Sequence, residues 1–523
     1  MGTAMDMAMG TVMAMRTEPG RHKVVVRRLG KVLLAAGLAS AMTPACAGSW
    51  TITPTVAVTE TATDNVARSD RNRQSDLISD VNPGIRIEGS GGRAKLRFDY
   101  QMHNLFYAQD SSRNETQNSL NALGTLEAIE DWLFIEASGY ISQQNLSAFD
   151  SSSSSSSVNV NTLNTTETST YRISPYIVGS FGSFADYQLR YNLATTSRKS
   201  NLSNDENVSE LVGSLKGTTS LASLGWSIDA STQDISYDRG RDNEADRLRG
   251  VLTYQINPQF RANLIGGVEA NNYQSLDKES TTTYGAGFDW SPTDRTLLSV
   301  SREHRFFGQA NAISFSHRTA STAWKFSDTE DVVTQTGQRS TVGLGTYYDL
   351  LAMNFPGISR KDAEALLGGI DLNAQIPGDF LTNESTIQHR RELSFALLGA
   401  RNTVTFSAGE TQSERASQGA LSSILGTSDF ANAQKIRQRV ASINWSHKLT
   451  PLSSLIATVS RSNSKGSGTS SSSLETTEQM YHLNLTTQLG PKTHANLGFR
   501  RAVGDGTVDY TENALTGTLS HQF

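Results

Sequence analysis

The sequence predicts an all-β fold in which a single antiparallel sheet of about 22 strands closes into a transmembrane barrel. Three observations predict it. Segments of about ten residues alternate apolar with polar side chains, and the connections between them are alternately short and long. The last nine residues, 515–523, alternate up to a terminal aromatic residue, and we expect them to form the strand that closes the barrel against residues 50–59. The pattern weakens near residues 310–335, so the expected range is about 18 to 22 strands.

Residues 1–47 have the form of a secretory signal peptide. Basic residues precede the apolar run 32–41, and Ala45, Cys46 and Ala47 supply small residues for cleavage. A run of this length is too short for a membrane helix, which takes about 20 residues. We therefore expect the barrel to comprise residues 48–523. Twin-arginine export through Arg27-Arg28 and lipidation of Cys46 are open alternatives.

Composition narrows the possible partners. Without residues 1–47, the chain has 40 basic and 49 acidic residues, a net charge of about −9. A nucleic-acid partner would call for a basic excess, so none is expected. Cys46 is the only cysteine. The predicted mature chain therefore has no disulfide and no cysteine metal site.

The alternating segments are the predicted strands. In the clearest of them, residues 94–103, Leu96, Phe98 and Tyr100 alternate with charged and amide side chains, so one face is apolar and the other can meet water. Further segments of this kind are residues 133–141, 185–193, 224–230, 248–256 and 260–268. A two-residue period maintained over this length predicts strands and leaves little room for helices.

The connections orient the predicted barrel. Short turns are expected at 89–92, 130–131, 182–183, 257–258, 291–294, 450–451 and 490–491. Longer polar stretches lie between them. Barrels of the outer membrane have short periplasmic turns and longer extracellular loops, so an even strand number places both ends of the barrel in the periplasm.

Aromatic residues mark the expected periplasmic interface. The candidate belt consists of Trp50, Trp132, Trp226, Trp290, Trp324, Trp445 and Phe523. In the predicted topology each tryptophan falls near the periplasmic end of a strand, as an interfacial aromatic belt requires. Tryptophans in the core of a soluble sandwich, the alternative, would have no reason to gather at one end.

The polar sides of the predicted strands supply the candidate functional residues. The candidate lumen-lining residues are Arg86, Glu88, Arg97, Asp99, His103, Arg190, Arg249 and Asp289. Mixed charges along a water-filled channel can hydrogen-bond a polar solute. The alternative role for each residue is only to solvate the inner wall.

One segment departs from the β pattern. Residues 359–368 begin with a capping serine, continue with alanine and leucine and end on glycine, which predicts a short helix. The helix lies in a long insertion, residues 334–384, on the extracellular side. A plug folded into the lumen and a helical cap on a loop are both compatible with this pattern.

Residues 288–326 contain short motifs that resemble those of a known protein family. The stretches 288–297, 305–308 and 316–319, with Trp324, resemble the outer-membrane barrel family associated with the PEP-CTERM/exosortase system. The resemblance implies an outer-membrane barrel whose relatives accompany exopolysaccharide biosynthesis and protein sorting. It implies no activity and no catalytic residues.

These observations predict a protein that lets a solute cross the membrane and does not catalyse a reaction. No nucleophile elbow, zinc-protease motif, phosphate loop or dinucleotide fingerprint is present, so we expect no enzyme activity, cofactor or metal. We predict a pore or export channel for a polar solute such as exopolysaccharide in the outer membrane of a Gram-negative cell. Its expected partners are outer-membrane lipid, the barrel-assembly machinery and periplasmic export components. A structural or adhesive surface protein anchored by its barrel is the alternative.

Overall fold

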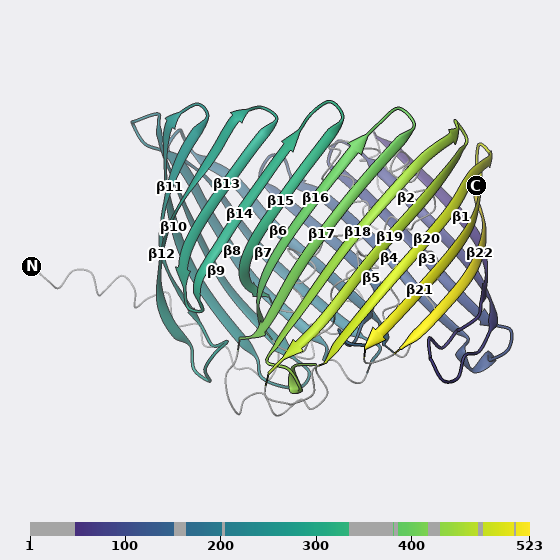
Figure 1. The fold of residues 1–523 in the computed structure, drawn as a ribbon. Helices are drawn as coiled ribbons and strands as arrows, with labels where there is room; N and C mark the ends of the chain where they lie inside the picture. Colours follow the sequence, from purple (N-terminus) through teal and green to yellow (C-terminus); the bar gives the residue numbers. More distant parts are fainter. Residues whose placement is uncertain are drawn as a thin grey trace, which may run out of the picture.

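The computed structural model describes residues 48–150, 164–200, 204–333, 380, 385–416, 429–468, 474–506 and 509–523. These residues form one sheet of 22 antiparallel strands that closes on itself (Figure 1). The predicted fold class and the best estimate of the strand number are confirmed. The predicted signal peptide and the predicted helix at 359–368 lie outside the described residues.

The strands follow one another around the barrel in chain order. The first eleven are β1 (Ser49–Thr63), β2 (Asp76–Ser90), β3 (Ala94–Tyr107), β4 (Glu115–Ile129), β5 (Leu133–Asn145), β6 (Thr165–Phe181), β7 (Ala185–Arg198), β8 (Glu206–Thr218), β9 (Leu224–Tyr237), β10 (Asn243–Asn257) and β11 (Phe260–Asn271). The others are β12 (Glu279–Thr293), β13 (Thr296–Arg305), β14 (Gly308–Arg318), β15 (Thr322–Val333), β16 (Thr386–Leu398), β17 (Asn402–Arg415), β18 (Lys435–Thr450), β19 (Ser453–Ser467), β20 (Glu475–Gly490), β21 (Thr493–Gly506) and β22 (Tyr510–Gln522). Within the described residues, two short 3-10 helices, η1 (Ser111–Arg113) and η3 (Asp429–Ala431), lie in connections.

The last strand closes the barrel against the first. β22 pairs with β1 in a register that places Gln522 opposite Thr55 and Ala514 opposite Thr63. The alternating segment 515–523 therefore has the closing position that the sequence predicts for it. Closure pairs residues 55–63 of the first strand with the last strand, so the sheet has no free edge along this stretch, as a sheet that crosses a bilayer requires.

The connections differ between the two ends of the barrel. Those after even-numbered strands contain two to five residues, and they include Pro258, Pro451 and Pro491 as the sequence predicts. We call this edge the short-turn end; it is at the top of Figure 1, where the chain also terminates. Most connections at the opposite edge, the long-loop end, are longer; the exceptions are those between β9 and β10, between β13 and β14 and between β21 and β22.

The outer face of the barrel is apolar. Along each strand, side chains on one side are large, hydrophobic and exposed, as Leu264 and Leu497 are, each 62% exposed. Other outward residues of this kind are Leu189, Leu193, Leu211, Leu252, Ile443, Val459, Leu483 and Leu515. A continuous surface of this composition would be unstable in water and is suited to lipid.

The inner face is polar, with small apolar clusters at the long-loop end. Thr59, Thr61 and Thr63 alternate with outward residues along β1 and are almost fully buried. One apolar cluster consists of Val66, Ile78, Leu105 and Tyr107, and another of Ala194, Val208, Ile235 and Tyr237. The stability of the fold therefore comes mainly from the closed hydrogen-bond ladder and the lipid-facing surface.

Gly89 on β2 lies directly opposite Trp50 on β1, both on the outer face. A Cβ atom at position 89 would lie 2.2 Å from the Trp50 ring, whereas a Cβ atom at Gly266 on β11 would meet nothing within 4 Å. We expect Gly89→Ala to destabilise the barrel by about 1–3 kcal/mol, because it forces the indole away. Gly266→Ala, the matched control, should be neutral or slightly stabilising. Denaturant midpoints of the heat-modifiable barrel measure both, and equal midpoints would contradict the expectation.

Candidate functional site

The candidate functional surface is the inner wall of the barrel. Two side-chain contacts that join parts of the barrel far apart around the sheet identify the inner side. Asn243 Nδ2, on β10, donates to Ser385 Oγ beside β16 at 3.0 Å. Arg68, in the connection after β1, lies 3.7 Å from Glu478 Oε1 on β20. Because side chains alternate along each strand, these contacts assign the polar side of every strand to the interior.

Four of the sequence-predicted lumen residues meet on β2 and β3. Arg86 Nε donates to Asp99 Oδ2 at 3.2 Å. Glu88 lies directly opposite Arg97 in the ladder. All four are on the inner side, and opposite charges face one another across the two strands. The arrangement keeps this part of the wall polar with little net charge.

Two further predicted residues lie on the inner wall in different surroundings. His103 Nδ1 lies 3.1 Å from the buried carboxylate of Asp80. Arg190 Nη1 lies 3.5 Å from Glu136 Oε1, and its guanidinium stacks 4.1 Å from the centre of the Tyr176 ring. Both side chains have partners that fix their direction, so they belong to an ordered wall.

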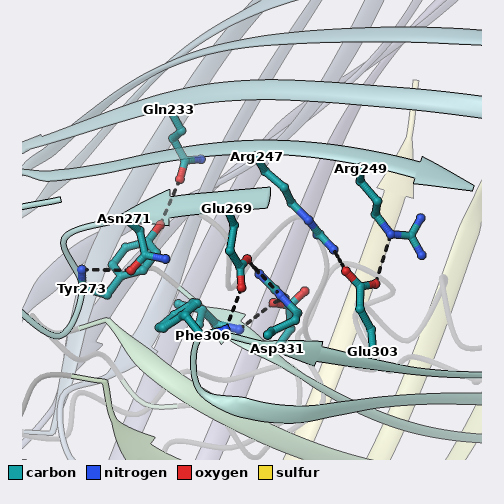
Figure 2. A network of polar contacts seen from close by, with 11 residues as sticks. Gln233, Arg247, Arg249, Glu269, Asn271, Tyr273, Glu303, Phe306 and Asp331 are labelled. Carbon is teal, nitrogen blue, oxygen red and sulfur yellow. Dashed lines mark hydrogen bonds and ion pairs between the residues drawn. The ribbon is translucent and has the colours of Figure 1, made fainter. Parts of the chain in front are cut away.

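Arg249, also predicted from the sequence, belongs to a larger network (Figure 2). Glu303 on β13 accepts hydrogen bonds from Arg247 Nη2 at 2.8 Å and from Arg249 Nε at 3.0 Å. Beside this pair, Glu269 on β11 accepts from Arg305 Nε at 3.1 Å and Nη2 at 2.9 Å. The figure shows these side chains converging from separate strands. The network orders both signs of charge along one wall.

Glycines on the intervening strands make room for this network. The inward positions between Arg249 and Glu303 include Gly267 on β11 and Gly285 on β12. A Cβ atom there would lie 2.2 Å and 2.3 Å, respectively, from backbone oxygens. The arginine on β10 therefore reaches a carboxylate three strands away over bare backbone.

Asp289, the last predicted lumen residue, lies nearer the short-turn end of the same wall. Its Oδ2 accepts from Asn263 Nδ2 at 2.9 Å and its Oδ1 accepts from Ser299 Oγ at 2.5 Å. These partners are on the two strands beside β12. The structure thus places all eight predicted residues on the inner wall, in several separate groups and not in one site.

A group of loop residues crosses the interior at the long-loop end. We call it the mouth cluster; it consists of the buried residues Phe149, Phe380, Phe430, Ala433 and Ile436. Phe149 follows β5, whereas Ile436 is on β18. Strands β1–β4 and β19–β22 separate these two strands on the shorter way around the barrel. The cluster therefore joins distant parts of the rim over the lumen.

Hydrogen bonds fix the segment after β5 in this position. Ser147 Oγ and the Ala148 backbone N–H donate to the two oxygens of Asp429, at 2.7 Å and 2.6 Å. Thr476 Oγ1, on β20, donates to the Phe149 carbonyl at 2.6 Å. Burial raises the pKa of Asp429, and these two donors act in the opposite direction. The contacts hold loop residues across the mouth at the long-loop end and make it narrower than the strands alone would leave it.

A buried charge network lies where the first and last strands meet. We call it the closure network. Glu512 on β22 is fully buried and binds both Arg500 Nη2 on β21 and Arg68 Nε, the latter at 2.9 Å. Tyr510 Oη donates to Glu478 Oε1 at 2.6 Å. Burial alone lowers the pKa of Arg68, but the adjacent carboxylates raise it above its usual value. The network pins the first long loop inside the barrel.

All six tryptophans lie at the short-turn end. Trp50, Trp226 and Trp324 are close to the starts of β1, β9 and β15, and the others are near or just beyond the ends of even-numbered strands: Trp132, Trp290 and Trp445. Phe523 is 62% exposed, and its backbone N–H donates to the Pro54 carbonyl at 3.0 Å. The predicted belt residues thus gather at the short-turn end of the barrel. An interfacial girdle of aromatic residues has such a location, at one end of the membrane-spanning strands.

Sequence reasoning missed the partners that give the wall its order. Four of these partners lie on the polar, inward side of their strands: Arg247, Glu269, Glu303 and Arg305. The alternation of polar and apolar residues that selected Arg249 could therefore have found them. The mouth cluster had no such signal. Its members come from three separate connections and from the start of β18, and only the closed barrel brings them together.

The described part of the chain shows neither a metal centre nor a membrane helix. No group of three or more histidine, cysteine, aspartate or glutamate side chains within it is placed to hold a metal ion. Within the same ranges, no helix combines the length and apolarity needed to cross a bilayer. What the inner wall offers chemically is an array of hydrogen-bond donors and acceptors in ordered ion pairs.

The closed sheet, its apolar outer face and its polar inner wall define a transmembrane β-barrel of the outer-membrane type. No family model and no curated protein matches the chain. Solved structures with a similar course of the chain include the FrpB iron transporter from Neisseria meningitidis, with 10% identity, a TM-score of 0.48 and coverage of 90% of this chain and 81% of that one. The siderophore receptor PirA from Pseudomonas aeruginosa has 7% identity, a TM-score of 0.43 and coverage of 90% and 80%. At these values the likeness assigns neither a family nor a ligand.

Proposed function

We propose that this protein is a channel in the outer membrane of a Gram-negative cell and that it passes a polar solute, with exopolysaccharide as the expected solute. The observation that carries the proposal is the ordered polar inner wall, where arginines and carboxylates face one another on β2 and β3 and again between β10 and β13. Paired charges present many hydrogen-bonding groups without a strong field of one sign, which suits an uncharged hydroxyl-rich solute. A barrel with this number of strands is wide enough for a polymer when its lumen is open.

Single-channel recording in planar bilayers tests the proposal. We expect purified protein to give discrete conductance steps. Bare-lipid conductance, both from the intact chain and after deletion of residues 334–384, would exclude a pore. Passage of the expected solute is tested separately, by flux of neutral oligosaccharides into liposomes that contain the protein.

The ion preference of the channel should respond to Glu303. Glu303→Gln leaves Arg247 and Arg249 without the carboxylate that both bind. We expect the reversal potential in a salt gradient to shift toward anion preference, because the wall gains a positive charge. Glu60→Gln is the matched control, since Glu60 is exposed on the outer face of β1 and contacts Ser79. Equal shifts for both variants, or none for Glu303→Gln, would contradict a conducting path along this wall.

The mouth cluster favours a second function, a surface protein whose barrel anchors its outer loops. A rim joined across the lumen by Phe149 and Phe430 suits an anchor better than an open pore. A deletion strain separates the two functions. Lost polysaccharide secretion supports the channel, whereas normal secretion with lost cell attachment supports the anchor.

A further inference from the structure

Arginines gather on the outer face of one part of the barrel. They form the outer arginine row, which consists of Arg391 on β16, Arg437 and Arg439 on β18, Arg461 on β19 and Arg501 on β21. Each occupies the side of its strand that also carries exposed apolar residues, so each points away from the lumen. The row faces the surroundings of the barrel, not its solute path.

The row lies just beyond the apolar surface, on the side of the long loops. On β19, Val459 is outward and 47% exposed, and Arg461 is the next outward residue. On β21, Phe499 is outward and Arg501 follows it in the same way. On β19 and β21, the two strands on either side of β20, the outward side chains thus change from apolar to cationic toward the long-loop end, where a lipid tail would give way to its headgroup.

Carboxylates neutralise only part of the row. Arg439 Nε binds Glu410 Oε2 at 2.6 Å, and Arg391 lies 3.1 Å from a carboxylate oxygen of Asp328. The remaining members, Arg437, Arg461 and Arg501, form no ion pair with any residue that the structure describes. Arg437 and Arg501 donate only to amide oxygens, those of Gln412 and Asn513, both at 3.1 Å. This sector therefore carries an excess of positive charge at headgroup depth.

At the same end of the barrel, the outer face of another sector has a different charge. Outward residues at the long-loop ends of β9 and β10 are acidic: Asp234, Glu244 and Asp246. Lys278 binds the last two, at 3.1 Å and 2.8 Å. The excess of arginine is thus a property of the β16–β21 sector and not of the whole rim.

We propose that the outer arginine row binds the phosphate groups of a phosphorylated glycolipid in the outer leaflet, a lipid A headgroup. The inference rests on the proposed outer-membrane location and its orientation with the long loops outside. A guanidinium offers a planar pair of N–H donors that matches phosphate oxygens, and its charge strengthens both hydrogen bonds. Phosphate is the anion that this interface presents to outward cations at that depth.

The ladder places two of these arginines within reach of one phosphate group. Arg461 lies opposite Ala441, and Arg439 is the next outward residue on the same neighbouring strand. Diagonal neighbours of this kind are about 7–8 Å apart, a distance that long side chains bridge readily. Arg439 and Arg461 therefore form the central pair of the site, with Arg501 on its flank.

The test measures binding of lipid A to the full-length protein in detergent by native mass spectrometry. The probes are lipid A with both phosphates and the same lipid A after removal of its phosphates. The variant is Arg439→Gln with Arg461→Gln. Arg302→Gln is the matched control, because Arg302 on β13 is the first outward residue after Val300, but belongs to another sector. Heat modifiability verifies the fold of each protein.

We expect binding of phosphorylated lipid A to be at least about tenfold weaker in the double variant, because two charge-assisted hydrogen-bonding groups are lost. The control should bind as the parent does, and the dephosphorylated lipid should bind weakly to all three. Equal binding by parent and double variant, or by both lipids, would overturn the inference. If the double variant does not fold, Arg461→Gln alone replaces it, since it removes no ion pair among the described residues. Single-channel recordings of the same preparations distinguish a failure of this inference from a failure of the channel.

Discussion

Glu512→Ala is expected to lower the stability of the barrel by about 3–5 kcal/mol, because it leaves buried arginines without their shared carboxylate. Glu512 is fully buried and holds both Arg68 and Arg500. These side chains come from the first long loop and from β21, on either side of the closing pair of strands. The change therefore weakens the seam of the barrel and the attachment of its first loop together.

The measurement is the denaturant midpoint of the folded, heat-modifiable form in lipid. Glu60→Ala is the control, since Glu60 is an exposed glutamate on β1 whose side chain accepts a hydrogen bond from Ser79. A second variant, Glu512→Gln with Arg500→Gln, removes one charge of each sign and should recover part of the loss. Equal midpoints for Glu512→Ala and Glu60→Ala would show that the closure network adds nothing to stability.

Asp429→Ala is expected to raise the conductance of the channel severalfold. The carboxylate of Asp429 accepts from Ser147 Oγ and from the Ala148 N–H, and without it the segment that carries Phe149 loses its attachment beside η3. A narrower mouth limits ion flow, so its release should increase single-channel conductance if the mouth cluster is the constriction.

Asp110→Ala is the matched control for this variant. Asp110 also accepts hydrogen bonds from a backbone N–H and a side chain, but both come from its own loop, at Ser112 and Arg113. It joins no distant parts of the rim. Its removal should leave the conductance unchanged. An unchanged conductance in Asp429→Ala as well would place the constriction elsewhere.

Much of the architecture followed from the sequence because the strand pattern is local. The alternation along 94–103 and the turn signals at Pro258, Pro451 and Pro491 are properties of a few consecutive residues, and the structure has strands and turns at these positions. The closing role of residues 515–523 followed from the same alternation. The insertion 334–384 and its predicted helix lie almost wholly outside the described residues. The helix therefore remains a prediction.

The candidate site was predicted less completely. The alternation of side chains along a strand identified Arg86, Arg190 and Arg249 as inward residues, because it depends only on position along one strand. This alternation cannot show which side chains these arginines bind, because their partners lie on other strands. The shared binding of Arg247 and Arg249 by Glu303 depends on the register of four strands.

The class of fold, the polar and apolar sides of its strands and the gathering of tryptophan at one edge could all be predicted from the amino-acid sequence. All three are encoded by residues that are close together in the chain. Which side chains meet became visible only in the folded barrel. Closure of β22 on β1 brings Glu512 to Arg68, and curvature of the sheet brings Asp429 to Ser147 across the mouth. Contacts between residues hundreds of positions apart depend on ring closure and register, which no local pattern records.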